Sequence, residues 1–76
     1  MYLVITKYDG KDDFYFLYAD GEKLKAIREQ IERTKNDFKS VIIQYYKCSS
    51  NRGFPLLEYR DKKWINLDED LLERLS

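Results

Sequence analysis

The stretch Phe14-Tyr15-Phe16-Leu17-Tyr18-Ala19-Asp20-Gly21 holds the change of periodicity that decides the fold of this 76-residue chain. Residues 14–19 are an unbroken apolar and aromatic run, which is typical of a β-strand. After Asp20-Gly21 the apolar positions recur at helical spacing, at Leu24, Ile27, Ile31 and Phe38. We therefore expect a strand over 14–19 and a helix over 21–35, with Asp20 as the N-cap and Glu22 in the first turn.

The residues before this stretch predict a hairpin. Residues 2–8 are apolar, β-branched and aromatic, and indicate a first strand. The turn segment that follows contains Asp9-Gly10, and glycine adopts the positive φ that tight hairpin turns need. We expect this strand to pair antiparallel with residues 14–19.

The residues after the helix predict three more strands and a short second helix. Asn36-Asp37 ends the first helix, and the expected strands cover 39–47, 54–60 and 64–67. Leu71, Leu72 and Leu75 form one apolar stripe over 68–76, capped by Asn66 with Glu69 or by Asp68 alone. A helix this short needs to dock on the sheet.

The predicted order is β-β-α-β-β-β-α in a single α+β domain over residues 1–76. Short links favour hairpins, so we expect a mainly antiparallel sheet with the helices packed on one face. Pairs such as Lys25 with Glu29 and Arg28 with Glu32 stand four residues apart and indicate a solvated outer helix face.

Alternation along the strands assigns side chains to two faces. We expect the face under the long helix to hold the apolar set Leu3, Ile5, Val41, Ile43, Leu57, Ile65 and Leu67. The opposite face would hold Tyr2, Val4, Tyr8, Ile42, Gln44, Tyr46, Arg60 and Trp64. The strand over 14–19 is apolar at every position and leaves its own faces undecided.

Composition excludes several classes of function. The chain has 14 basic and 14 acidic residues and no histidine, which removes imidazole nucleophile activation, imidazole metal ligation and a proton switch near neutral pH. Its zero net charge argues against duplex DNA binding. Cys48 is the lone cysteine and is interpreted as a small strand-end residue. With no disulfide pair, signal peptide or membrane-length apolar run, the expected location is the cytoplasm.

Charge and acidic clusters give only weak signals for chemistry. Residues 21–67 carry 11 basic and 6 acidic side chains, and the two ends together carry 3 and 8. Asp61-Lys62-Lys63 has the Asp-x-Lys spacing of some metal-dependent nucleases, whose chemistry would need a further upstream carboxylate to complete the metal site. We interpret it as an ordinary hairpin turn, because the chain is short for a nuclease fold. We expect no enzyme, no cofactor and no bound metal.

The sequence therefore predicts a binding protein that uses an uncovered, aromatic sheet face. A chain of this length has no third layer to cover it. The candidate binding residues are Tyr2, Tyr8, Tyr46 and Trp64, with Lys47 and Arg60 at the rim. The leading hypothesis is a protein-interaction module or small regulator, such as an inhibitor or a homodimer. The alternatives are single-stranded nucleic acid on the same face, a metal-dependent nuclease, and half-buried tyrosines that pack on one another.

Overall fold

The computed structural model has seven elements in the predicted order. It describes residues 1–10, 13–18, 21, 23–34, 38–47, 49 and 51–75. Its elements are β1 (Tyr2–Lys7), β2 (Phe14–Tyr18), α1 (Leu24–Arg33), β3 (Ser40–Lys47), β4 (Arg52–Arg60), β5 (Lys63–Asn66) and α2 (Glu69–Leu75). The predicted α+β fold class is thereby confirmed.

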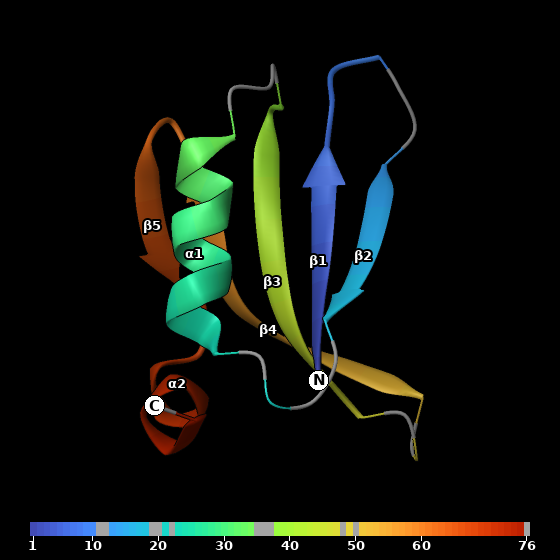
Figure 1. Cartoon of the computed structure of the whole chain (residues 1–76), viewed down its shortest axis with the longest axis vertical. Coiled ribbons are helices and arrows are strands. Elements are labelled where there is room, and N and C mark those ends of the chain that lie inside the picture. The colour runs from blue at the N-terminus through green and yellow to red at the C-terminus, as the bar shows by residue number, and fades with distance from the viewer. Residues whose placement is uncertain are drawn as a thin grey trace.

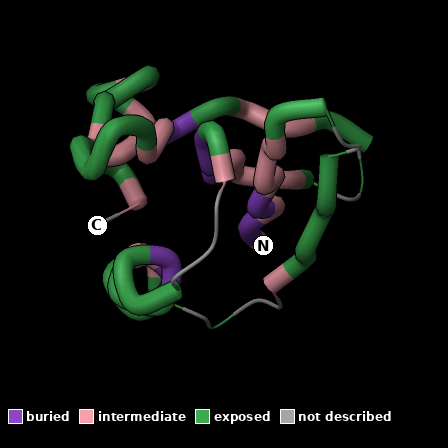
Figure 2. Tube along the Cα trace, turned by 90° about the horizontal axis from the view of Figure 1, so that it is seen from above, coloured by how far each residue is buried: buried purple, intermediate pink, exposed green. Residues whose placement is uncertain are grey.

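The five strands form one antiparallel sheet in the order β2-β1-β3-β4-β5 (Figure 1). β1 lies between its hairpin partner β2 and the strand that follows α1, so α1 connects β2 to a strand that is not its neighbour. The two edges of the sheet are β2 and β5. In Figures 1 and 2, β2 stands apart from α1.

The strand register divides the side chains between the two faces. Val4 lies opposite Phe16 on one side and Ile43 on the other, so these three project to the same face. Ile5 lies opposite Tyr15 and Ile42, which project to the other face. We call the first the helix-side face and the second the open face.

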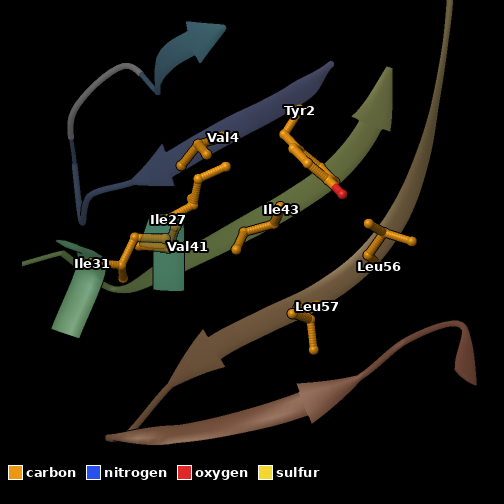
Figure 3. Packing of buried hydrophobic residues seen from close by; sticks show 8 residues of the cluster. All are labelled: Tyr2, Val4, Ile27, Ile31, Val41, Ile43, Leu56 and Leu57. Atoms are coloured by element: carbon orange, nitrogen blue, oxygen red, sulfur yellow. The ribbon is translucent and has the colours of Figure 1, made fainter. Parts of the chain in front are cut away.

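The core lies between α1 and the helix-side face. Ile27 and Ile31 of α1 are buried in one cluster with side chains of β1, β3 and β4 (Figure 3). The buried part of α1 faces the sheet, as Figure 2 shows. The leucines of α2 pack against the same cluster, and the N–H of Leu71 donates to Asp68 Oδ1 at 3.0 Å. Asp68 alone therefore caps α2, as one of the two predicted arrangements has it.

A β-bulge brings two successive leucines of β4 into the core. Ile43 lies opposite Leu57, but the next residue of β3, Gln44, lies opposite Pro55. Leu56 is the extra residue of β4, and both Leu56 and Leu57 are buried. A bulge breaks the strict alternation of side chains, so neighbouring residues need not face opposite sides.

The first helix is shorter than predicted. It runs over Leu24–Arg33 instead of 21–35, and Phe38 packs against the core from outside it. Lys23 precedes the helix and makes no side-chain cap. The predictions for Asp20, Glu22, Asn36-Asp37 and Cys48 concern positions outside the described residues.

The predicted division of faces is partly wrong. Tyr2, Val4 and Trp64 lie on the helix-side face, whereas Leu3, Ile5 and Ile65 lie on the open face. β1 is apolar at both alternate sets of positions, so its pattern does not favour either face. The assignments of Val41, Ile43 and Leu57 to the helix side, and of Ile42 and Gln44 to the other side, are confirmed.

Candidate functional site

The open face carries two rows of mainly apolar side chains in register. One row crosses all five strands and consists of Tyr15, Ile5, Ile42, Glu58 and Ile65. The next row consists of Leu17, Leu3, Gln44 and Pro55. Both helices pack on the core cluster at the helix side, so no described element covers these rows.

Exposure on the open face rises from the centre of the sheet to its edges. Leu3, Ile5 and Ile42 on the central strands are half-buried. At the edges, Tyr15 and Leu17 on β2 and Ile65 on β5 are exposed. A run of branched aliphatic residues with water on one side is the composition of a domain core or a permanent interface.

The charges of the open face are mostly basic and lie at one end. Lys7 follows Ile5 on β1 by two positions, and Arg60 follows Glu58 on β4 in the same way. Lys63 lies opposite Arg60 in β5. By strand alternation these three cations share the open face with one carboxylate among the described strand residues, that of Glu58.

Both faces of the edge strand β2 are exposed. Phe14 and Phe16 project to the helix side and are 54% and 55% exposed, while Tyr15 and Leu17 project to the open side and are 62% and 60% exposed. Four consecutive large apolar side chains are thus more than half in water.

A groove of about 390 Å³ separates β2 from α1 on the helix side. Phe14, Phe16 and Tyr18 line it from the strand, and Gln30, Ile31 and Thr34 line it from the helix. The Tyr18 hydroxyl donates to Gln30 Oε1 at 3.2 Å and bridges the two walls. The groove is mainly apolar with a few polar groups, which is the usual character of a binding cleft.

Three of the predicted binding residues lie on the helix side instead of the open face. Tyr2 is a core residue with 9% exposure, and its burial, together with the nearby Tyr45, raises the pKa of its phenol. Tyr8 lines the groove and packs edge-to-face on Phe14, with ring centres 5.6 Å apart. Trp64 is half-buried and packs on Tyr59, with ring centres 4.7 Å apart.

The other three predicted residues lie at separate places. The Tyr46 hydroxyl on the open face donates to Asn51 Oδ1. Arg60 is exposed at the end of β4. Lys47 Nζ lies 5.8 Å from the ring centre of Phe54. The six residues therefore do not form one surface, and the predicted tyrosine–tryptophan platform is wrong as a geometric unit.

The apolar residues of the open face were missed as binding candidates. The sequence pattern predicts Leu3, Ile5 and Ile65 in the core and does not decide the faces of β2. Once Val41 and Ile43 are placed under the helix, the pairing of β1 with β3 and β2 determines which residues of β1 and β2 lie on the open face. The pairing of β4 with β3 and β5 does the same for Ile65. The pairing of β1 with β3 follows an α-helical connection and is not visible in the sequence pattern.

The described residues contain no group of three or more His, Cys, Asp or Glu side chains that could hold a metal ion. Asp61 lies in the β4–β5 turn. Neither helix of the described chain is long and apolar enough to cross a membrane.

Comparison with protein-family models, with curated proteins and with solved structures gives no match for this chain.

Proposed function

We propose that this protein is a small non-enzymatic binding module that acts on another protein through its open face. The observation that carries the proposal is the row of Tyr15, Ile5, Ile42 and Ile65 on four of the five strands, interrupted only by Glu58 on β4, with no described element above it. Burial of apolar area stabilises association at about 25 cal/mol per Å² before the costs of ordering. A domain with a small core gains stability when a partner covers this face.

Charge complementarity indicates the chemistry of the partner. Among the described strand residues of this face, Lys7, Arg60 and Lys63 outnumber the one carboxylate, that of Glu58. A partner that presents aliphatic side chains beside carboxylates would pair with both parts of the surface. Such charges raise the association rate and orient the partner more than they raise the affinity.

Single-stranded nucleic acid is the second candidate, and the three cations that share the open face with Tyr15 favour it. Bases stack on aromatic rings, however, and the centre of the open face is aliphatic. Trp64 and Tyr2, which would have served for stacking, lie on the helix side. Protein recognition therefore accounts for more of the surface.

The test is a methyl-detected NMR titration with three probes. The first is an amphipathic helical peptide of leucine and glutamate, the second has lysine in place of glutamate, and the third is an oligothymidylate. We expect the acidic peptide to shift the methyl signals of Leu3, Ile42 and Ile65. The methyls of Val41 and Ile43, beneath α1, are the internal control.

Charge-reversal variants sharpen the test. R60E with K63E should weaken binding of the acidic peptide about tenfold or more, whereas K25E on the exposed side of α1 should leave it unchanged. Shifts produced by the oligothymidylate alone would replace the proposal with nucleic-acid binding. Equal shifts from both peptides, or shifts confined to the helix-side methyls, would contradict it.

A further inference from the structure

We infer that β2 pairs antiparallel with β2 of a second copy of this chain, which joins two five-stranded sheets into one of ten strands. This inference concerns the sheet edge and goes beyond the partner proposed for the open face. It starts from the fact that Phe14, Tyr15, Phe16 and Leu17 are each more than half exposed.

The direction of those side chains selects the kind of partner. Phe14 and Phe16 project to the helix side, and Tyr15 and Leu17 to the open side. A molecule that sits on either face of the sheet would cover only one of these pairs. A strand in the plane of the sheet contacts both, because its side chains alternate in the same way.

The two edges of the sheet differ in how they are protected. Natural edge strands carry lysine, proline, a bulge or very short length, which prevent pairing with other chains. β5 is four residues long, begins with Lys63 and ends with Asn66. β2 has five residues, all apolar or aromatic, with no charge, proline or glycine. Only β2 therefore has the composition of a strand whose outer edge is paired.

The sequence of β2 is suited to pairing with itself. A two-fold axis at Phe16, the middle residue, pairs all five positions and places Phe16 opposite its own copy. Tyr15 then lies opposite Leu17, and Phe14 opposite Tyr18. Aromatic–aromatic and aromatic–aliphatic cross-strand pairs of this kind stabilise antiparallel sheets, and no charge is left unpaired within the strand.

The available area fits a reversible dimer. Large aromatic side chains bury about 150–250 Å² each when fully covered, so the exposed halves of these residues supply about 800 Å² over both copies. That lies at the small end of specific interfaces, where association is transient and depends on concentration.

The first test is the mass in solution, measured by sedimentation over about 10–500 µM protein. We expect the mass to rise toward twice 9.3 kDa. L17K adds a charge to an already exposed position of β2 and should leave the protein monomeric. I65K adds the same charge to the other edge strand and is the matched control, which should still dimerise.

A cysteine pair tests the register. In a C48S background, F16C should form an intermolecular disulfide under mild oxidation, because self-paired residues bring their Cα atoms within about 4.5–5.5 Å. Y15C lies opposite Leu17 in this register and should cross-link much more slowly. Faster cross-linking of Y15C would overturn the register.

A monomer throughout the concentration range would overturn the inference and leave β2 to a strand of another protein. A dimer abolished by I65K but not by L17K would also overturn it, since the copies would then meet through the open face. The peptide titration of the open face is read out independently of both results. The β2 dimer and the open-face partner can therefore be refuted separately.

Discussion

The indole Nε1 of Trp64 donates a hydrogen bond of 2.6 Å to Oε1 of Glu32, which joins the edge strand β5 to the helix α1. The guanidinium of Arg28, one turn earlier on the same helix, lies 4.9 Å from the centre of the Trp64 ring. The sequence predicts the side chains of Arg28 and Glu32 on a solvated helix face. They instead connect α1 to the β5 side of the sheet, opposite the edge formed by β2.

We expect W64F to lower the free energy of unfolding by about 1–2 kcal/mol. Phenylalanine keeps a ring against Tyr59 but removes the hydrogen bond to Glu32 and weakens the cation–π contact with Arg28. Urea denaturation followed by far-UV circular dichroism measures the change, since the variant has no tryptophan fluorescence.

The matched control is E29Q, which changes an exposed glutamate of the same helix and should shift stability by less than about 0.5 kcal/mol. In a double-mutant cycle, E32A, which removes the acceptor oxygen, should lower stability in the wild-type background but add little to W64F. Full additivity of the two changes would show that the Trp64–Glu32 contact does not stabilise the docking of α1.

A second prediction tests which face of β1 is buried. V4A should lower stability by about 2 kcal/mol because the Val4 side chain lies in the core beneath α1. I5A removes a larger side chain from the open face and should lower the stability of the monomer by less. Denaturation at a protein concentration below that of any association measures both. A larger loss for I5A would contradict the assignment of faces.

The elements of this fold were predictable because their signals are local. The run from Phe14 to Tyr18, the stripe of Ile27 and Ile31, and the Asp9-Gly10 turn each specify their structure within a few residues. The ends of α1 differ most from expectation, and β4 begins at Arg52, two residues before its predicted start. The boundaries of elements are less predictable from sequence than the elements themselves.

The division of faces was less predictable because it depends on tertiary pairing. β1 has Leu3 and Ile5 on one side and Val4 on the other, so either side satisfies the hydrophobic pattern. Trp64 and Tyr2 were expected at the surface for their binding chemistry, but they fill space beneath and beside α1. The length of the chain predicts an uncovered sheet face. Which residues lie on that face, and that they are mainly aliphatic, can be known only from the strand register.

A third prediction concerns the tight turn between β4 and β5. Asp61 and Lys62 have φ values of +54° and +61°, and the flanking residues Arg60 and Lys63 pair directly. Positive φ at both central positions is the pattern of a type I′ hairpin turn, which favours glycine at the second position. We expect K62G to raise the free energy of unfolding by about 1 kcal/mol.

The control for this turn is K62A, which removes the same charge but keeps the unfavourable left-handed conformation. It should leave stability within about 0.5 kcal/mol of the wild type. If K62A stabilised the protein as much as K62G, relief of charge repulsion with Lys63 would be the cause, and backbone conformation would not.

A fourth prediction follows from the burial of Tyr2, which raises the pKa of its phenol above the ordinary value of about 10. The folded state therefore favours the neutral phenol more than the unfolded state does. The stabilisation that the neutral Tyr2 phenol gives the folded state is fully present below pH 10 and is lost as the pH rises through the folded-state pKa. The wild type should lose stability in this alkaline range, and Y2F should lose less of it.

Urea midpoints measured from about pH 8 to pH 11.5 compare the two proteins. Near pH 8, Y2F should be close to the wild type, because phenylalanine preserves the ring that packs on Tyr45 at a centre distance of 6.1 Å. Y15F, which changes an exposed tyrosine, is the control and should keep the steeper alkaline decline of the wild type. Parallel curves for Y2F and the wild type would show that the alkaline loss arises from groups other than Tyr2.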